Sequence, residues 1–181
     1  MKKVLLDFDN TMGIEGKDVD DGLALLYLLG REDVEIKGVT AVFGNGDLDQ
    51  VSQATKKLFS DLELGELPLK IGARGPDVES TPASDFMVET VDSHPNEITI
   101  LALGPLTNLK NAYSEDSEFF GKVDEIILMG GVTEPIKVGE REVGELNFSC
   151  DPEAAKITLN APVPITIAES NLCLQAYFND E

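Results

Sequence analysis

The chain has 181 residues, of which 34 are acidic and 14 basic, and its formal net charge at pH 7 is −20. This length suits one domain, and 42% hydrophobic residues supply a core, so the chain is not a disordered acidic tail. Nucleic acids and anionic membranes are poor partners for it, because both are bound through clustered Lys and Arg. Small molecules and cations are the better candidates.

Cysteine usage and the amino terminus predict a soluble cytoplasmic protein. Cys150 and Cys173 are the two cysteines, and their spacing gives no disulfide framework and no C-x-x-C motif. Three apolar residues stand between Lys3 and Asp7, too few for a signal-peptide core. No apolar run approaches the roughly 20 residues that span a membrane.

Short apolar runs alternate with helical patterns along the chain, which is typical of βαβ units. Strands are predicted at residues 4–8, 35–42, 69–72, 98–103, 124–129 and 163–168. Helices are predicted at residues 21–29, 48–58, 85–91, 106–113 and 152–160, the last with Asp151 as N-cap before Pro152. Residues 72–84 and 130–144 are predicted surface loops.

These patterns predict an α/β fold with an open, mostly parallel sheet flanked by helices, similar to a Rossmann fold. Ligands of such sheets bind beyond the carboxyl ends of the strands. The residues that follow each predicted strand are therefore the first candidates for a site.

An acidic cluster follows the first predicted strand. Two carboxylates about 4 Å apart repel by roughly 4 kcal/mol at an effective dielectric near 20, so converging carboxylates need a cation or a shared proton. Ligands that mix carboxylates with backbone carbonyls favour Ca²⁺ over Mg²⁺. The alternative is a solvated loop whose acids stabilise a helix N-terminus. The cluster comprises Asp7, Asp9, Glu15, Asp18, Asp20 and Asp21.

The position of Asp7 and Asp9 argues against a solvated loop, because unpaired charge is costly inside an apolar strand. Residues 4–12, VLLDFDNTM, resemble the first motif of haloacid-dehalogenase-type phosphatases, in which the first Asp is the nucleophile and the second an acid/base. The same strand, followed by Asp20-Asp21 and an apolar helix, resembles the amino-terminal signature of the inosine-uridine nucleoside hydrolases.

Four later segments resemble nucleoside hydrolases in the family's order. They are GVTAVFGN at 38–45, ILALGPLTNL at 100–109, IILMGG at 126–131 and GELNFSCDPEAA at 144–155, the most specific match. A phosphatase would need a later Lys and a further acidic pair, which do not stand out. The sequence therefore favours nucleoside hydrolase ancestry over the phosphatase interpretation.

The resemblance implies Ca²⁺-dependent hydrolysis of the N-glycosidic bond of ribonucleosides to base and ribose, a reaction of nucleoside salvage. It gives Asp9 the role of ligand and catalytic base, and makes Asp21 and the Leu103 carbonyl further ligands. Asp7 is expected to support them. A carboxylate-rich pocket would stabilise the positive charge that develops on the sugar. The residues expected to contact the substrate are Asp20, Asn45, Met129, Glu145 and Asn147.

The chain departs from the family in three places. Residues 10–19 are an insertion, which we expect to project outward rather than bring Glu15 or Asp18 to the metal. Gly139 stands where the family often has an Asn for the ribose 5′-hydroxyl. Family members are also longer, and their final portion carries an Asp ligand and a His for the leaving base. The single histidine here, His94, is expected on a surface loop.

The domain is thus predicted to be one nucleoside hydrolase-like unit over residues 1–181 without the family's carboxyl-terminal portion. A second hypothesis is a homologue that binds Ca²⁺ and a ribose-containing ligand without turnover. Asp151 and Glu153 are interpreted as helix-cap and first-turn acids outside the site. An exposed apolar surface, where later elements would pack, would favour a homo-oligomer.

Overall fold

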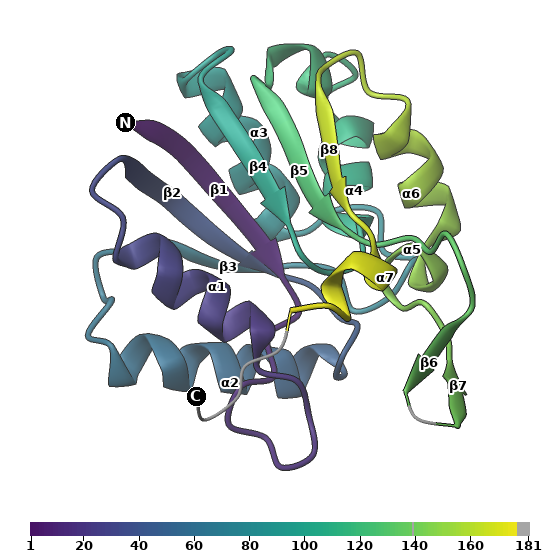
Figure 1. Ribbon diagram of the computed structural model, residues 1–181. Coiled ribbons are helices and arrows are strands. Elements are labelled where there is room, and N and C mark those ends of the chain that lie inside the picture. Colours follow the sequence, from purple (N-terminus) through teal and green to yellow (C-terminus); the bar gives the residue numbers. More distant parts are fainter. Residues whose placement is uncertain (139, 177–181) are drawn as a thin grey trace.

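A computed structural model describes residues 1–138 and 140–176, and it contains a six-stranded parallel sheet in the order β3-β2-β1-β4-β5-β8 (Figure 1). The strands are β1 (Lys2–Phe8), β2 (Val34–Ala41), β3 (Leu69–Ile71), β4 (Ile98–Ala102), β5 (Glu125–Met129) and β8 (Ile165–Ala168). The α/β architecture predicted from the sequence is confirmed. The first strand lies in the middle of the sheet, paired with β2 on one side and β4 on the other.

Helices connect the strands. They are α1 (Asp20–Leu29), α2 (Leu48–Asp61), α3 (Pro82–Ser93), α4 (Thr107–Glu115), the 3-10 helix η1 (Phe119–Lys122), α5 (Asn147–Cys150), α6 (Pro152–Leu159) and α7 (Ser170–Cys173). Helix α3 begins three residues earlier than predicted, because the Thr81 and Ser84 side chains form a capping box around Pro82. No helix in the described part of the chain is long and apolar enough to cross a bilayer.

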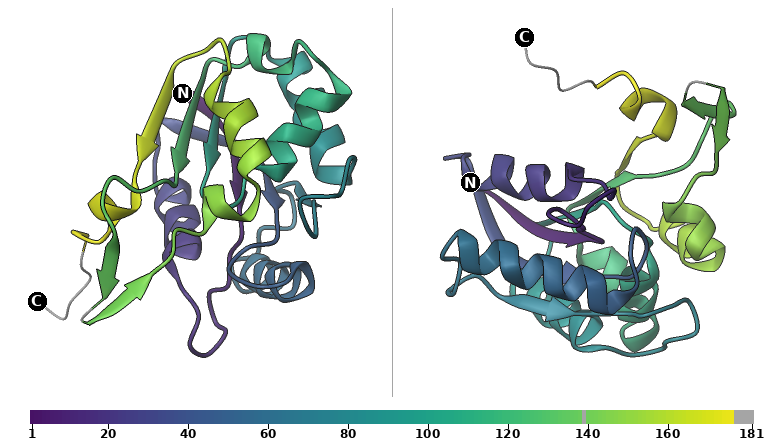
Figure 2. Two further views of the ribbon diagram at one scale, coloured as in Figure 1. Left: turned by 90° about the vertical axis from the view of Figure 1, so that its right-hand side faces the viewer. Right: turned by 90° about the horizontal axis from the view of Figure 1, so that it is seen from below.

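Two hydrophobic clusters cover the two faces of the sheet. Successive strand residues point to opposite faces, so Leu5 joins one cluster and Leu6 the other. The larger cluster packs β4 and β5 against α3, α4 and α6, which gather on one side of the sheet in Figure 2. The smaller cluster packs β1 and β2 against α1 and α2. Strands that are covered on both faces have mainly apolar sequences, which is why they could be predicted from the sequence.

The prediction that residues 130–144 form a loop is partly wrong. The segment contains an antiparallel hairpin of β6 (Ile136–Val138) and β7 (Arg141–Val143), in which Ile136 pairs with Val143. Each strand has three residues and includes a charged side chain, so neither gave an apolar run. The short helices α5 and α7 were also not predicted.

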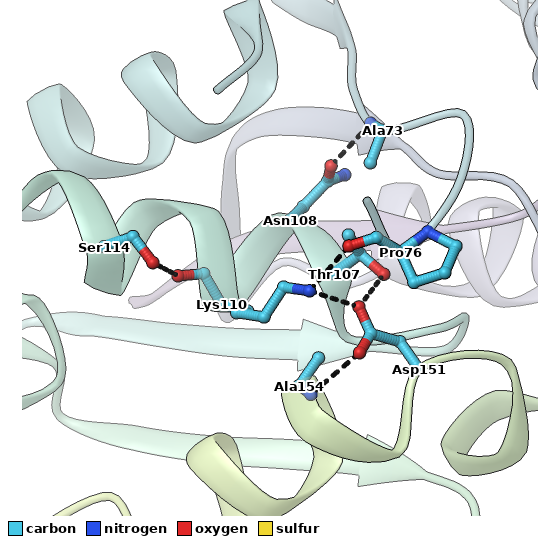
Figure 3. Close-up of polar contacts among 8 residues, drawn as sticks. All are labelled: Ala73, Pro76, Thr107, Asn108, Lys110, Ser114, Asp151 and Ala154. Carbon is cyan, nitrogen blue, oxygen red and sulfur yellow. Dashed lines mark hydrogen bonds and ion pairs between the residues drawn. The ribbon is translucent and has the colours of Figure 1, made fainter. Parts of the chain in front are cut away.

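Asp151 caps α6 as predicted, and it also forms a buried ion pair (Figure 3). Its carboxylate accepts hydrogen bonds from the Ala154 amide at 3.0 Å and the Thr107 hydroxyl at 2.8 Å. The Lys110 ammonium lies 2.8 Å from it, and the two side chains are 12% and 2% exposed. Lys110 also donates to the Pro76 carbonyl at 2.8 Å. One lysine thus joins α4, α6 and the loop after β3.

Candidate functional site

A cavity of about 580 Å³ opens at the carboxyl edge of the sheet, within the range of roughly 300–1,000 Å³ for small-molecule sites. From β1 the chain adds β2 and β3 on one side of the sheet and then β4, β5 and β8 on the other. The loops after β1 and β4 therefore run in opposite directions and leave a crevice between them. Eight of the nine predicted site residues line it: Asp9, Asp20, Asp21, Asn45, Leu103, Met129, Glu145 and Asn147.

Asp9 stands directly after β1 and is 2% exposed. Its Oδ2 accepts a 2.5 Å hydrogen bond from the Asn45 amide, and its own amide donates to Asp21 Oδ2 at 2.9 Å. Gly44 permits this approach: it has φ +155°, and a Cβ there would lie 2.1 Å from Asp9 Oδ2. The Gly-Asn pair after β2 therefore holds the Asp9 carboxylate through the backbone.

Asp20 and Asp21 are the first two residues of α1. Asp21 is 6% exposed, whereas Asp20 is exposed at the cavity. Besides these amide contacts, the carboxyl groups of Asp9 and Asp21 lie within hydrogen-bonding reach of each other. Burial raises the pKa of Asp9 to about 6 and that of Asp21 well above its usual value, and repulsion by Asp20 adds to both.

Asp7 is fully buried and does not line the cavity. Its Oδ1 accepts hydrogen bonds from the Thr40 hydroxyl at 2.6 Å and the Asn108 amide at 2.8 Å. Within residues 1–138 and 140–176, its Oδ2 has no partner, and burial raises the pKa of Asp7 to about 7. Asp7 therefore offers no oxygen to the cavity, and any support that it gives to a metal is indirect.

Asn147 joins the ends of β4 and β5. Its Nδ2 donates to the Leu103 carbonyl at 2.7 Å and to the Met129 carbonyl at 3.0 Å. A carbonyl oxygen has two lone pairs, so the Leu103 oxygen retains one for a ligand. The geometry makes Asn147 a clamp on the two strand ends in addition to its predicted contact with a sugar.

Glu145 closes the loop that carries the β6–β7 hairpin. Its carboxylate accepts hydrogen bonds from the amides of Gly131, Phe148 and Ser149 at 3.2, 2.9 and 2.8 Å, and from the Ser149 hydroxyl at 2.9 Å. Partial burial alone would raise its pKa, but the four donors together lower it. The carboxylate that was expected to contact ribose thus has its acceptor positions filled by the protein.

The inserted residues 10–19 project away from the sheet at their tip, as expected (Figure 1). The loop returns to the site at its end, where Asp18 and Val19 line the cavity. Lys17 donates to the Asn45 carbonyl, and the Thr11 hydroxyl donates to the Asp18 carbonyl at 3.1 Å. The tip therefore lies as expected, whereas the end of the insertion borders the cavity; a contact between Asp18 and a metal stays untested.

Two other predicted positions lie away from this geometry. His94 follows α3 as its C-cap and lies outside the cavity lining, and it is half-buried rather than fully exposed. Gly139 lies outside the described residues. Sequence reasoning missed Ile136 and Val143 of the hairpin and Cys173 and Leu174 near α7, which also line the cavity. The only available signal was the short alternation in the hairpin.

The donor set fits a hard cation only if the backbone takes part. Among residues 1–138 and 140–176, no three His, Cys, Asp or Glu side chains gather into a metal site. Asp9, Asp21 and the Leu103 carbonyl together offer two carboxylates and a carbonyl, the ligand chemistry of Ca²⁺ and Mg²⁺.

The structure is thus an α/β protein with buried carboxylates beside a cavity at the carboxyl edge of a parallel sheet. The profile of the family described as "Inosine-uridine preferring nucleoside hydrolase" matches residues 4–181, and the chain belongs to that family. The match assigns the Asp-x-Asp segment to nucleoside hydrolases and overturns the phosphatase interpretation.

Named relatives agree with this assignment. The chain is 29% identical over 209 residues to uridine nucleosidase 1 of Arabidopsis thaliana, covering 99% of the chain and 60% of the relative. The purine-preferring ribonucleoside hydrolase from Gardnerella vaginalis superposes with a TM-score of 0.82 at 26% identity, covering 98% of this chain and 64% of that one. A plant nucleoside hydrolase, PpNRh1, also gives 0.82 at 26% identity, covering 98% of this chain and 63% of that one. The chain therefore spans about three-fifths of the length of these relatives.

When a chelator removes any bound cation, the melting temperature of the chain is expected to fall as the pH rises from about 4 to 7. The folded-state pKa values of Asp7 and Asp9 are about 7 and 6, above the unfolded value near 3.9. The folded state then binds more protons than the unfolded state, so deprotonation destabilises it. Calorimetric melts across this range measure the effect. Asp7→Asn should flatten the slope, and a melting temperature that rises with pH would contradict the assignment.

Proposed function

We propose that the cavity binds a ribonucleoside through Ca²⁺ and that Asp9 promotes hydrolysis of its N-glycosidic bond to base and ribose. The observation that carries this proposal is the buried contact between Asp9 and Asp21, because two converging carboxylates need a cation or a shared proton and a cation neutralises both. The names of the relatives, uridine nucleosidase and ribonucleoside hydrolase, support the substrate class.

Asp9, Asp21 and the Leu103 carbonyl would hold the cation. When bound, it would neutralise their charge, fix the sugar's vicinal hydroxyls and acidify a water molecule. Asp9 would also accept a proton from the attacking water, and the Asn45 amide on Oδ2 keeps its carboxylate in place for this role. The water oxygen forms the new bond to C1′ while the bond from C1′ to the base nitrogen breaks.

The remaining cavity residues orient the sugar in this proposal. Asp20 is exposed to the cavity and accepts a hydrogen bond from the 2′-hydroxyl. Asn45, Met129 and Asn147 border the same space. For Glu145 to contact a sugar hydroxyl, one of its present donors must be exchanged, and the Ser149 hydroxyl is the one that leaves without breaking a backbone hydrogen bond.

One observation favours a second candidate function, binding of Ca²⁺ and a ribose-containing ligand without turnover. The described lining of the cavity contains no histidine, the residue type that the resemblance implies as the proton donor to the departing base. The chain also covers only 60% of the Arabidopsis relative. Turnover therefore depends on whether the base leaves with a proton from water.

Purified chain incubated with uridine or inosine, with Ca²⁺ or with chelator, distinguishes the two functions. Ribose release that requires Ca²⁺ supports hydrolysis, and calorimetric nucleoside binding without release supports the binding protein. We expect Asp21→Asn to weaken Ca²⁺ affinity by about 100-fold or more. Mutating a residue that only hydrogen-bonds to a metal ligand already lowers metal affinity about 10–100-fold, and Asp21 is proposed as a ligand itself. Asp49→Asn, an exposed acid of α2, is the matched control. Unchanged Ca²⁺ affinity in Asp21→Asn would refute the proposed site.

A further inference from the structure

Asn108 is a buried amide that joins the carboxyl ends of three neighbouring strands. It is the second residue of α4 and is fully buried. Its Nδ2 donates to Asp7 Oδ1 of β1 at 2.8 Å and to the carbonyl of Ala41, the last residue of β2, at 3.3 Å. Its Oδ1 accepts from the amide of Ala73, two residues beyond β3, at 2.9 Å (Figure 3).

The Asn108 amide occupies a space that is open because residue 72 is a glycine. A Cβ at Gly72 would lie 2.2 Å from Asn108 Oδ1 and 2.4 Å from Nδ2. Contacts this short would force the amide out of its place. The backbone after β3 and the Asn108 side chain therefore fit each other closely, and the orientation of the amide is fixed by packing as well as by hydrogen bonds.

The hydrogen bonds of Asn108 continue to Asp9 along two routes. One passes through Asp7, two residues before Asp9 on the same backbone. The other passes through Ala73, whose carbonyl accepts from the Phe43 amide at 3.0 Å. Two residues after Phe43, the Asn45 amide donates to Asp9 Oδ2. The amide thus fixes both the strand that carries Asp9 and the turn that holds its carboxylate.

We propose that Asn108 is a positioning residue for the Asp9 carboxylate. By tying the end of β1 to the turns after β2 and β3, it keeps the Asn45 amide against Asp9 Oδ2 and leaves Oδ1 directed at the cavity. The value of this position for catalysis rests on the proposed function, whereas the position itself is a property of the fold. Mutation of a residue that hydrogen-bonds to a metal ligand typically lowers metal affinity about 10–100-fold.

Thr40 offers a matched control. Its hydroxyl donates to the same Asp7 oxygen at 2.6 Å, and its remaining contact is with the Leu6 carbonyl at 3.4 Å. Thr40→Val removes that hydroxyl at nearly constant shape and leaves the links to Ala41 and Ala73 intact. A difference in Ca²⁺ affinity or in the Asn45 resonance between the Thr40 and Asn108 variants therefore reports the effect of the hydrogen bonds from Asn108 to Ala41 and Ala73.

The test uses ¹⁵N-labelled chain and two variants that act on the amide in different ways. Asn108→Asp keeps the acceptor for Ala73 and removes the donor, and Gly72→Ala displaces an intact amide. In both we expect the Asn45 amide proton to move upfield, because its hydrogen bond to Asp9 lengthens. Calorimetric Ca²⁺ affinity should fall about tenfold or more. Thr40→Val should leave the Asn45 resonance and the affinity within about twofold of wild type.

Folded Asn108→Asp and Gly72→Ala proteins with an unchanged Asn45 resonance would overturn the proposal. Failure of both to fold, while Thr40→Val folds, would also overturn it and leave Asn108 a purely structural role. Absence of Ca²⁺ binding and ribose release in the wild-type chain would refute the proposed function instead. In that case the Asn45 resonance alone still decides the positioning role.

Discussion

Asp9→Asn should lower kcat for ribose release by about 10²–10⁴-fold, the usual contribution of a general base. Asparagine keeps the size of the side chain and an oxygen that can accept from the Asn45 amide. It loses the basic oxygen that accepts the proton of water and the charge that holds the cation. Steady-state ribose release at saturating Ca²⁺ and nucleoside measures the effect.

The same variant is expected to melt at a higher temperature than the wild type in chelator. The wild-type carboxylate is 2% exposed beside Asp21, and a neutral amide removes their repulsion. This combination of gained stability and lost activity is typical of a functional charge. Asp49→Asn should change neither property. Wild-type kcat in Asp9→Asn would exclude Asp9 as the base.

Lys110→Met should destabilise the fold by about 3–5 kcal/mol, the usual cost of removing one partner of a buried ion pair. Asp151 is 2% exposed and would retain its charge without the ammonium that lies 2.8 Å away. The Pro76 carbonyl would also lose its donor. Urea denaturation at pH 7 gives the difference in the free energy of unfolding.

A control and a pH series make this prediction specific. Lys57→Met breaks an exposed pair with Asp61 on α2 and should cost less than about 1 kcal/mol. Burial alone would raise the pKa of Asp151, but Lys110, the Ala154 amide and Thr107 outweigh it and hold that pKa below its usual value. The ion pair therefore stabilises the fold above the unfolded pKa near 4, and its contribution is lost as the pH falls. A deficit of less than 1 kcal/mol at pH 7 would contradict the buried pair.

The sheet was predictable because its strands are covered on both faces. Val4–Phe8 is apolar except for Asp7, and Ile98–Ala102 is apolar except for Thr99, so both strands can be recognised without tertiary information. The cost of unpaired charge beside a buried strand singled out Asp9, whereas its pairing with Asp21 was expected from the resemblance to nucleoside hydrolases.

The roles of Glu145 and Asp7 could not be predicted in the same way. The partners of Glu145 are mainly backbone amides of Gly131, Phe148 and Ser149, whose directions depend on the path of the loop. The depth of Asp7 depends on α4, which brings Asn108 to it across about one hundred residues of sequence. Such contacts leave no periodic trace in the chain.

The central place of β1 also determines when the acidic strand can become buried during synthesis. Leu5 pairs with Gly38 on one side, but its partner on the other side is Ile100. Until residues 98–108 have left the ribosome, β1 lacks one neighbouring strand and Asp7 lacks the Asn108 amide. The enclosure of Asp7 therefore depends on contacts that are distant along the chain, and such contacts slow folding.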